Sequence, residues 1–313
     1  MLKVLFSKVL QVFILAVFIN TICFILMHAL PGDKALKIAA GRYGPDVVTN
    51  EIAQNVAQEL GLNRPLYEQY FDSLFQLLQF DLGYSLVTGQ KIIDELQTQF
   101  GYSLYLALFA FILSLIISFP LGIYSGSKNN GFIDKLSLFF SIVFKAIPPF
   151  VLAIILIIIF SIQLNILPPA GFEDWTYFIL PGLTLALALS AVSNRLIRES
   201  MSEVAKSTYF TYGKYKGLSN YVLVKRHALK NAFIPILAFL GLQSIYLIEG
   251  VVVVESLFAF PGIGHALVHA VLSRDVPMIQ GTVLLMGIFF ILINLFTDIL
   301  SKYLDPRLGF KHD

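Results

Sequence analysis

Six apolar stretches, each long enough to cross a lipid bilayer, constrain this chain more than any other feature of its sequence. A bilayer core of about 30 Å needs roughly 20 apolar residues in a helix. The stretches cover about residues 9–30, 101–125, 136–162, 177–197, 232–254 and 281–303. Because 57% of the 313 residues are hydrophobic and only 13% are charged, the charges are too few to cover a soluble domain. The sequence therefore predicts an all-α integral membrane protein with six transmembrane helices.

The first and fourth apolar stretches are less typical of membrane spans than the other four. Lys3 and Lys8 precede the first, as in a signal peptide, but the apolar run from Val9 to Leu30 is too long for a cleaved signal, and no A-x-A site follows it. We expect a retained helix there. The fourth stretch is the weakest of the six, because Pro181 and Gly182 interrupt it.

The orientation of the chain follows from its basic residues. If the N-terminus is cytoplasmic, 15 of the 22 Lys and Arg residues lie in cytoplasmic segments and six lie in outer segments, while Lys145 lies within the third stretch. Positive charge concentrates on the cytoplasmic side of membrane proteins. Both termini are therefore predicted to face the cytoplasm.

The first stretch is followed by an extracytoplasmic segment, residues 31–100. Its portion ELGLNRPLYEQYFDSLFQLLQFDLG (59–83) places Leu66, Tyr70, Leu74 and Leu77 at helical spacing. We expect this segment to be helical and to pack on the membrane helices of its own chain. The predicted organisation is residues 1–30, the extracytoplasmic segment 31–100, and a five-helix core over 101–313.

A basic cytoplasmic segment, residues 199–231, separates the fourth and fifth stretches. Residues 199–209 are predicted to continue the fourth helix, with Glu203 and Lys206 at i,i+3. Gly217 then permits a left-handed turn that a residue with a side chain would resist, and a second helix follows at 220–231. Two short helices joined in this way can pass the movement of a soluble partner into the membrane. The alternative is a basic loop that only sets topology and contacts anionic lipid.

The order of residues in this segment resembles the coupling segment of ABC-importer permeases of the dipeptide/oligopeptide/nickel family. That family carries roughly Y-x-R-T-A-R-A-K-G-L, then R-H-A-L-x-N-A, and a proline opening the next span. The matching positions here are Tyr209, Lys214, Lys216, Gly217, Leu218, Arg226, His227, Ala228, Leu229, Asn231, Ala232 and Pro235. Four positions depart from the pattern: alanine is usual at Gly213 and Tyr215, and Tyr212 and Thr211 replace the usual threonine and arginine.

Further landmarks of the family follow in order along nearly the whole chain. They are ALPGD (29–33), ELGLNRPLYEQY (59–70), DLGYS (81–85), PLG (120–122), AIPPF (146–150), LNILPPAG (164–171), ILPGLTLA (179–186), ESLFAFPGIGHAL (255–267), RDVPMIQG (274–281) and LDPR (304–307). The resemblance implies a type I ABC-importer permease fold in a bacterial inner membrane.

The resemblance also implies partners. This chain would be half of a heterodimeric permease that works with two cytoplasmic ATPase subunits and an extracytoplasmic substrate-binding protein. Contact with the ATPase would involve Tyr209, Lys214, Lys216, Gly217, Leu218, Arg226 and His227. No cofactor is expected in this chain, since ATP and Mg²⁺ would bind to the ATPases; the sequence contains no G-x-x-x-x-G-K-[ST] loop.

The sequence offers no candidate for catalysis. It contains neither a G-x-S-x-G elbow nor an H-E-x-x-H pair, so a transport subunit is predicted rather than an enzyme. The net charge of +2 argues against nucleic acid as a partner. A secondary transporter remains the alternative class, because six spans alone do not exclude it.

Two ionisable residues within the spans are candidates for a translocation pathway. Charged groups in hydrocarbon are costly and usually face a cavity. Lys145 precedes the Pro148–Pro149 break and either lines the pathway or extends its aliphatic stem towards the cytoplasmic surface. Glu249 lies deeper, in the fifth span, and is predicted to be paired, protonated or facing water. A Lys145–Glu249 ion pair is one hypothesis.

The cargo is harder to predict than the fold. His265 and His269 share one face of an outer helix, but two ligands make an incomplete metal site, so no metal site is predicted. The segment GFEDWTYFILPG (171–182) is similar to the nickel and metallophore branch of the family. We therefore expect nickel or a nickel chelate as the cargo, with di- or oligopeptides as the alternative.

Overall fold

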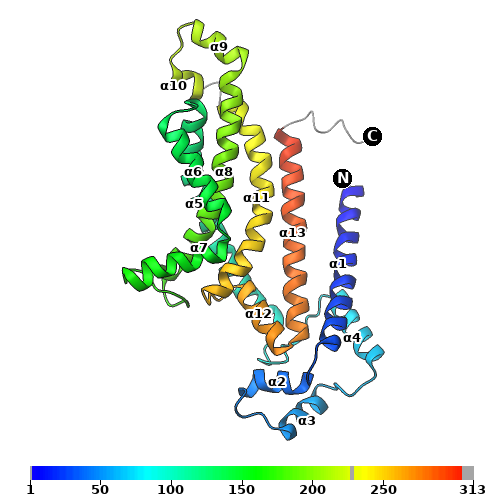
Figure 1. The fold of residues 1–313 in the computed structure, drawn as a ribbon. Coiled ribbons are helices and arrows are strands. Elements are labelled where there is room, and N and C mark those ends of the chain that lie inside the picture. Colours follow the sequence, from blue (N-terminus) through cyan, green and yellow to red (C-terminus); the bar gives the residue numbers. More distant parts are fainter. Residues whose placement is uncertain (1, 226–228, 305–313) are drawn as a thin grey trace. The chain divides into compact units, whose positions relative to one another are not determined.

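The computed structural model describes residues 2–225 and 229–304, which are predominantly helical (Figure 1). Within these residues, pairing between extended segments is limited to one isolated antiparallel bridge between Tyr84 and Lys91. The chain divides into two compact units. Unit 1 comprises Met1–Ser103 and Pro261–Leu292, and unit 2 comprises Leu104–Phe260 and Ile293–Asp313. The predicted all-α class is confirmed.

Five helices are long and apolar enough to cross a membrane among the residues that the structure describes. They are Phe6–Ala29, Ile92–Ser127, Trp175–Lys206, Phe239–Leu257 and Val276–Leu300, and they correspond to the first, second, fourth, fifth and sixth predicted spans. The fourth is not interrupted. Pro181 lies in the first turn of helix α8 (Ile179–Lys206), where a helix tolerates proline because the missing N–H has no intrahelical partner.

The third predicted span is broken into two pieces. Helix α6 (Phe132–Ala146) ends before Pro148, and α7 (Pro149–Leu156) continues into a π-helix over Ile157–Gln163. The two pieces are bent by 104°. Ile147 precedes a proline, which disfavours the α conformation, and it is extended with ψ 121°. The predicted span over 136–162 is therefore not a straight helix, and the described residues hold up to six spans when the bent pair counts as one.

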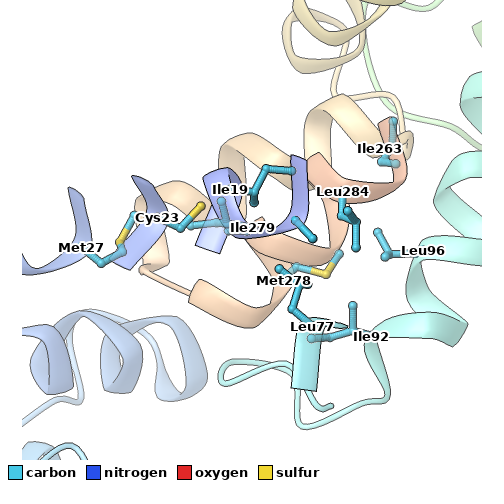
Figure 2. Close-up of a cluster of buried hydrophobic side chains, with 12 residues drawn as sticks. Ile19, Cys23, Met27, Leu77, Ile92, Leu96, Ile263, Met278, Ile279 and Leu284 are labelled. Atoms are coloured by element: carbon cyan, nitrogen blue, oxygen red, sulfur yellow. The ribbon is translucent and has the colours of Figure 1, made fainter. Parts of the chain in front are cut away.

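Unit 1 has a hydrophobic core to which five helices contribute. Figure 2 shows Ile19 and Cys23 of α1 (Leu2–Ala29) in this cluster, near Met278 and Ile279 of α13 (Val276–Leu304). Further members come from α4 (Leu66–Leu78), from the start of α5 (Ile92–Ser127) and from α12 (Ile263–Ser273). Since α4 belongs to the extracytoplasmic segment, the expectation that this segment packs on its own membrane helices is confirmed.

The rest of the extracytoplasmic segment forms a small core of its own. Helices α2 (Lys34–Tyr43) and α3 (Asn50–Glu59) pack together around buried Ile38, Ala39 and Val56. Each begins at a capping side chain that accepts backbone N–H bonds: Asp33 caps α2 and Thr49 caps α3. The helix that carries the second span starts at Ile92, before the predicted apolar stretch that begins at residue 101.

Unit 2 is held together by close helix contacts at glycines. In α5, Gly122 and Gly126 face α8; a Cβ at Gly126 would lie 2.5 Å from the Arg198 carbonyl oxygen and 2.5 Å from Met201 Cβ. Small residues four apart let membrane helices approach closely. Helix α11 (Leu229–Leu257) runs beside α8, with the short helices α9 (Thr208–Tyr215) and α10 (Asn220–Leu223) at one end (Figure 1).

Candidate functional site

The coupling segment begins with a break that the sequence analysis did not predict. Helix α8 ends at Lys206, and Ser207 is extended, with φ −67° and ψ 151°, before α9 starts at Thr208. The Ser207 hydroxyl donates to the Val204 carbonyl at 2.6 Å, which satisfies one free carbonyl at the helix end. The predicted helix over 199–209 is therefore divided, because the backbone turns at Ser207.

The turn after α9 has the left-handed glycine that the sequence predicts. Gly217 has φ +80°. Its N–H donates to the Lys214 carbonyl at 2.9 Å, and the N–H of Leu218 donates to the Gly213 carbonyl at 3.2 Å. These two bonds make a Schellman motif, which ends a helix and reverses the chain. A side chain at Gly217 would strain this turn, since L-residues disfavour a positive φ.

Helix α9 has one buried face and one exposed face. Phe210 and Gly213 are buried, and Phe210 packs in a core with Leu223 of α10 and with Ile197 and Met201 of α8. The exposed face is aromatic and basic. It carries Tyr209, Tyr212, Lys214, Tyr215 and Lys216, and the neighbouring Gly217 and Leu218 are also exposed. The structure thus brings five of the seven predicted coupling residues to one exposed surface, joined to the α8 core through Phe210.

The lysines of this surface lie over aromatic rings. Lys214 Nζ lies 5.2 Å from the centroid of Phe210, and Lys216 Nζ lies 4.8 Å from that of Tyr212. Such cation–π contacts contribute about 0.5–1 kcal/mol at exposed sites. They orient both ammonium groups along the surface of α9.

The departure at Gly213 has a steric explanation. A Cβ at this position would lie 2.4 Å from Leu223 Cδ2, and Leu223 is almost fully buried. The leucine of α10 therefore occupies the space that an alanine side chain would need. Tyr215, which also replaces the usual alanine, is 86% exposed and requires no change in the core.

Part of the predicted second helix lies outside the described residues. Arg226 and His227, both predicted to contact the ATPase, fall in the undescribed positions 226–228. The described flanks are α10, which covers Asn220–Leu223, and α11, which begins at Leu229.

The four predicted pathway residues line one cavity in unit 2. Lys145, Pro148, Pro149 and Glu249 surround a space of about 570 Å³ together with apolar side chains of α7, α8 and α11. Lys145 lies in the last turn of α6, where the carbonyl ends of the helix favour a positive charge. The chain bends by 104° at the Pro148–Pro149 break, and both prolines line the cavity.

The two charges of the cavity do not bond to each other. Both Lys145 and Glu249 are exposed, and the salt bridges among the described residues include no pair between them. The hypothesis of a Lys145–Glu249 ion pair is therefore not supported by this conformation. An exposed carboxylate inside a membrane-spanning helix is costly in lipid, so the face of α11 that carries Glu249 is suited to water.

A polar network between α6 and α8 was not predicted from the sequence. Asp134 of α6 forms a bidentate ion pair with Arg198 of α8, with Arg198 Nη2 2.9 Å from Asp134 Oδ2. One turn earlier in α8, Asn194 Nδ2 donates to the hydroxyls of Ser137 and Ser141, both at 2.7 Å. The sequence does place Asp134 just before the third stretch and Arg198 just after the fourth. Charged residues at such positions usually face the interior of a helix bundle, so these two could have been predicted to lie there.

The two outer histidines lie together without a completed metal site. The ring centroids of His265 and His269 are 4.5 Å apart on α12. Burial lowers the pKa of His265, and the charge of His269 lowers it further. The described part of the chain holds no group of three His, Cys, Asp or Glu side chains arranged to bind a metal ion.

Comparison with known families accounts for both halves of the chain. Residues 118–310 match the family described as binding-protein-dependent transport system inner membrane component, and residues 1–107 match the N-terminal family of such membrane components. The chain belongs to this family. It is a permease subunit of an ABC importer in the bacterial inner membrane and not a catalytic subunit.

Relatives of this permease carry the name of a specific cargo. The glutathione transport system permease protein GsiC of Escherichia coli strain K12 is 36% identical over 293 residues, which cover 94% of each chain. The GsiC proteins of Escherichia coli O6:H1 (strain CFT073) and Shigella flexneri serotype 5b (strain 8401) have the same identity and coverage.

A solved structure supports the fold. The crystal structure of an amino acid ABC transporter with histidines has a TM-score of 0.52 and 16% identity, and the match covers 69% of this chain and 94% of that chain. At this identity the likeness concerns the arrangement of helices alone.

Proposed function

We propose that this permease imports small peptides, such as glutathione or dipeptides, through the cavity that contains Lys145 and Glu249. One observation carries the proposal. An acid and a base, with no ion pair between them, line the same otherwise mostly apolar cavity in membrane-spanning helices. A peptide carries an ammonium and at least one carboxylate, so both charges of the cavity have a counterpart in the cargo.

The cargo proposal departs from the preference for nickel that the sequence suggested. The relatives at 36% identity are named for glutathione, a tripeptide, and none of those reported above is named for nickel. The cavity also offers no cluster of soft or imidazole ligands for a bare metal ion. These points favour the peptide alternative.

The driving force is proposed to come from two ATPase subunits that grip the exposed face of α9. ATP and Mg²⁺ would bind to those subunits, and closure of the ATPase dimer would move α9 and the turn at Gly217. The core around Phe210 would carry this movement into α8 and so into the wall of the cavity. A second permease subunit and an extracytoplasmic binding protein complete the proposed assembly.

Uptake by the assembled transporter tests the proposal. We expect ATP-dependent uptake of radiolabelled glutathione or a dipeptide in proteoliposomes, with no uptake of free nickel. Lys145→Gln and Glu249→Gln should each raise KM about 10-fold, because each removes a charge-assisted contact of about 1.5 kcal/mol. Lys135→Gln is the matched control, since Lys135 is an exposed lysine of the same helix outside the cavity.

Two results would refute this function. Nickel uptake without peptide uptake would reject the cargo. Uptake that follows a proton gradient and does not need ATP would reject the ABC mechanism and favour a secondary transporter.

A further inference from the structure

Helix α4 has a stripe of exposed aromatic side chains that takes no part in the proposed transport mechanism. Tyr67, Phe71 and Phe75 are spaced four residues apart, so they share one face of the helix. Their exposed fractions are 65%, 55% and 64%. A stripe of large apolar side chains on a helix surface marks an interaction with something outside the chain.

The other two faces of α4 already have partners. One face packs on α1, where Tyr70 Oη lies 2.9 Å from Thr21 Oγ1 and Leu77 enters the core of unit 1. The second face is polar. Its acids Glu68 and Asp72 bind Arg64 at 3.1 and 2.8 Å. The aromatic stripe lies between these two faces. Helix α4 therefore has an apolar and a polar exposed side, and its third side is packed on the membrane helix α1.

Hydrogen bonds fix the depth of α4 along α1. Ser73 Oγ donates to Asn20 Oδ1 at 2.7 Å, and Gln280 Nε2 of α13 donates to the same oxygen at 3.0 Å. Asn20 lies nine residues before the end of α1 at Ala29, which is about 14 Å at 1.5 Å per residue. Because the first span covers Phe6–Ala29, α4 packs on the predicted outer half of this helix.

The surface of α1 at this level is itself suited to hydrocarbon. Phe18, Ile22 and Ile25 are exposed on a helix that is a candidate membrane span. Both α1 and α4 therefore expose large apolar side chains, and aromatic side chains concentrate near the membrane–water interface in membrane proteins.

We propose that α4 is an amphipathic anchor in the outer interface of the bilayer. Tyr67, Phe71 and Phe75 insert among the lipid acyl chains, while Glu68 and Asp72 face water. The occupant of the stripe is lipid, because its three side chains are aromatic and α4 packs along the outer half of a helix that is a candidate membrane span. The one hydroxyl of the stripe, on Tyr67, donates to Glu68 on the polar side of the helix at 3.3 Å. This anchoring holds the extracytoplasmic segment against the membrane independently of which cargo is carried.

A tryptophan reporter tests this placement. Trp175 is the only tryptophan of the chain, so the Trp175→Phe variant has no tryptophan fluorescence of its own. Phe71→Trp and Phe75→Trp place the reporter in the stripe, and Gln76→Trp places it on the polar side as a matched control. The full chain, with the subunits that co-purify, is reconstituted in nanodiscs of ordinary or dibrominated phosphatidylcholine.

Two quenchers then report on the surroundings of each tryptophan. We expect brominated lipid to remove about half of the emission of Phe71→Trp and Phe75→Trp, whereas aqueous iodide quenches only Gln76→Trp. Iodide quenching of the stripe positions as strong as that of Gln76→Trp would overturn the proposal. Protection of both stripe positions from both quenchers would also overturn it, because a protein would then cover the stripe.

A folding control keeps these outcomes interpretable. Cys23, the only cysteine, is buried in the core that contains Leu77 of α4. A variant in which Cys23 stays unreactive towards maleimide retains the packing of α4 on α1. Two stripe positions are tested, so if one tryptophan variant misfolds, quenching of the other still tests the proposal.

Discussion

Replacing Asp134 with asparagine should destabilise unit 2 far more than breaking an exposed ion pair on the same helix. The Asp134 side chain is 2% exposed and that of its partner Arg198 is 18% exposed. Asp134 also accepts a hydrogen bond from the backbone N–H of Asn130 at 2.8 Å. Removing the carboxylate charge therefore leaves the Arg198 guanidinium largely buried without an anion.

The magnitude follows from burial. Breaking a buried pair from one side costs about 3–5 kcal/mol, and the partial exposure of Arg198 puts this pair at the lower end, about 3 kcal/mol. For a folding unit of this size that corresponds to roughly 6–12 °C in Tm. The control is Glu199→Gln, which breaks the Arg195–Glu199 pair of 3.0 Å, with side chains 67% and 54% exposed. An exposed pair contributes at most about 1 kcal/mol, or roughly 4 °C.

Thermal unfolding of the detergent-solubilised protein, followed by intrinsic fluorescence, measures both variants. A shift for Asp134→Asn no larger than that for Glu199→Gln would refute the reasoning. The double variant Asp134→Leu with Arg198→Leu sharpens the test. It should recover most of the lost stability, because it leaves no unpaired buried charge.

Three further predictions follow from local geometry. Gly126→Leu should destabilise the α5–α8 contact by at least about 1–3 kcal/mol in the same unfolding assay, whereas Gly101→Ala, whose Cβ would meet nothing within 4 Å, should be neutral or slightly stabilising. Gly217→Ala should cost about 1–2 kcal/mol at the left-handed turn and reduce cargo-stimulated ATPase activity, and unchanged stimulation would contradict a role for the turn. The lowered pKa of His265 means that its contribution to stability is present above the unfolded pKa of about 6.5 and is lost as the pH falls towards the folded pKa. His265→Gln should flatten this part of the stability profile, and a profile equal to that of wild type would show that His265 does not cause it.

The sequence predicts long spans well because a bilayer requires an uninterrupted apolar run. Their ends are less certain, since a helix can continue into water; α5 begins at Ile92, well before its apolar run. The third span was predicted as one piece although its prolines were recognised. The preference of the residue before proline for an extended backbone, seen at Ile147, gives the correct division.

Within the candidate site, the sequence could predict where the backbone needs a particular residue type, but it could not predict which side chains bond to each other. Gly217 was predictable because few other residues adopt a positive φ without strain. The break at Ser207 was not, since serine is tolerated inside helices and only its ψ of 151° reveals the turn. The pairing of Asp134 with Arg198 depends on how α6 packs against α8, and hydropathy carries no information about that.

Photo-cross-linking from the exposed face of α9 tests the central claim that this face is gripped by the ATPase. A photoreactive phenylalanine replaces Tyr215, which is 86% exposed, in the transporter purified with its partner subunits. The matched control carries the same group at Trp175, which is 73% exposed and precedes α8 at the predicted outer side. The account predicts an adduct with the nucleotide-binding subunit from position 215 and none from position 175. No adduct from position 215, with the ATPase present and active, would contradict it.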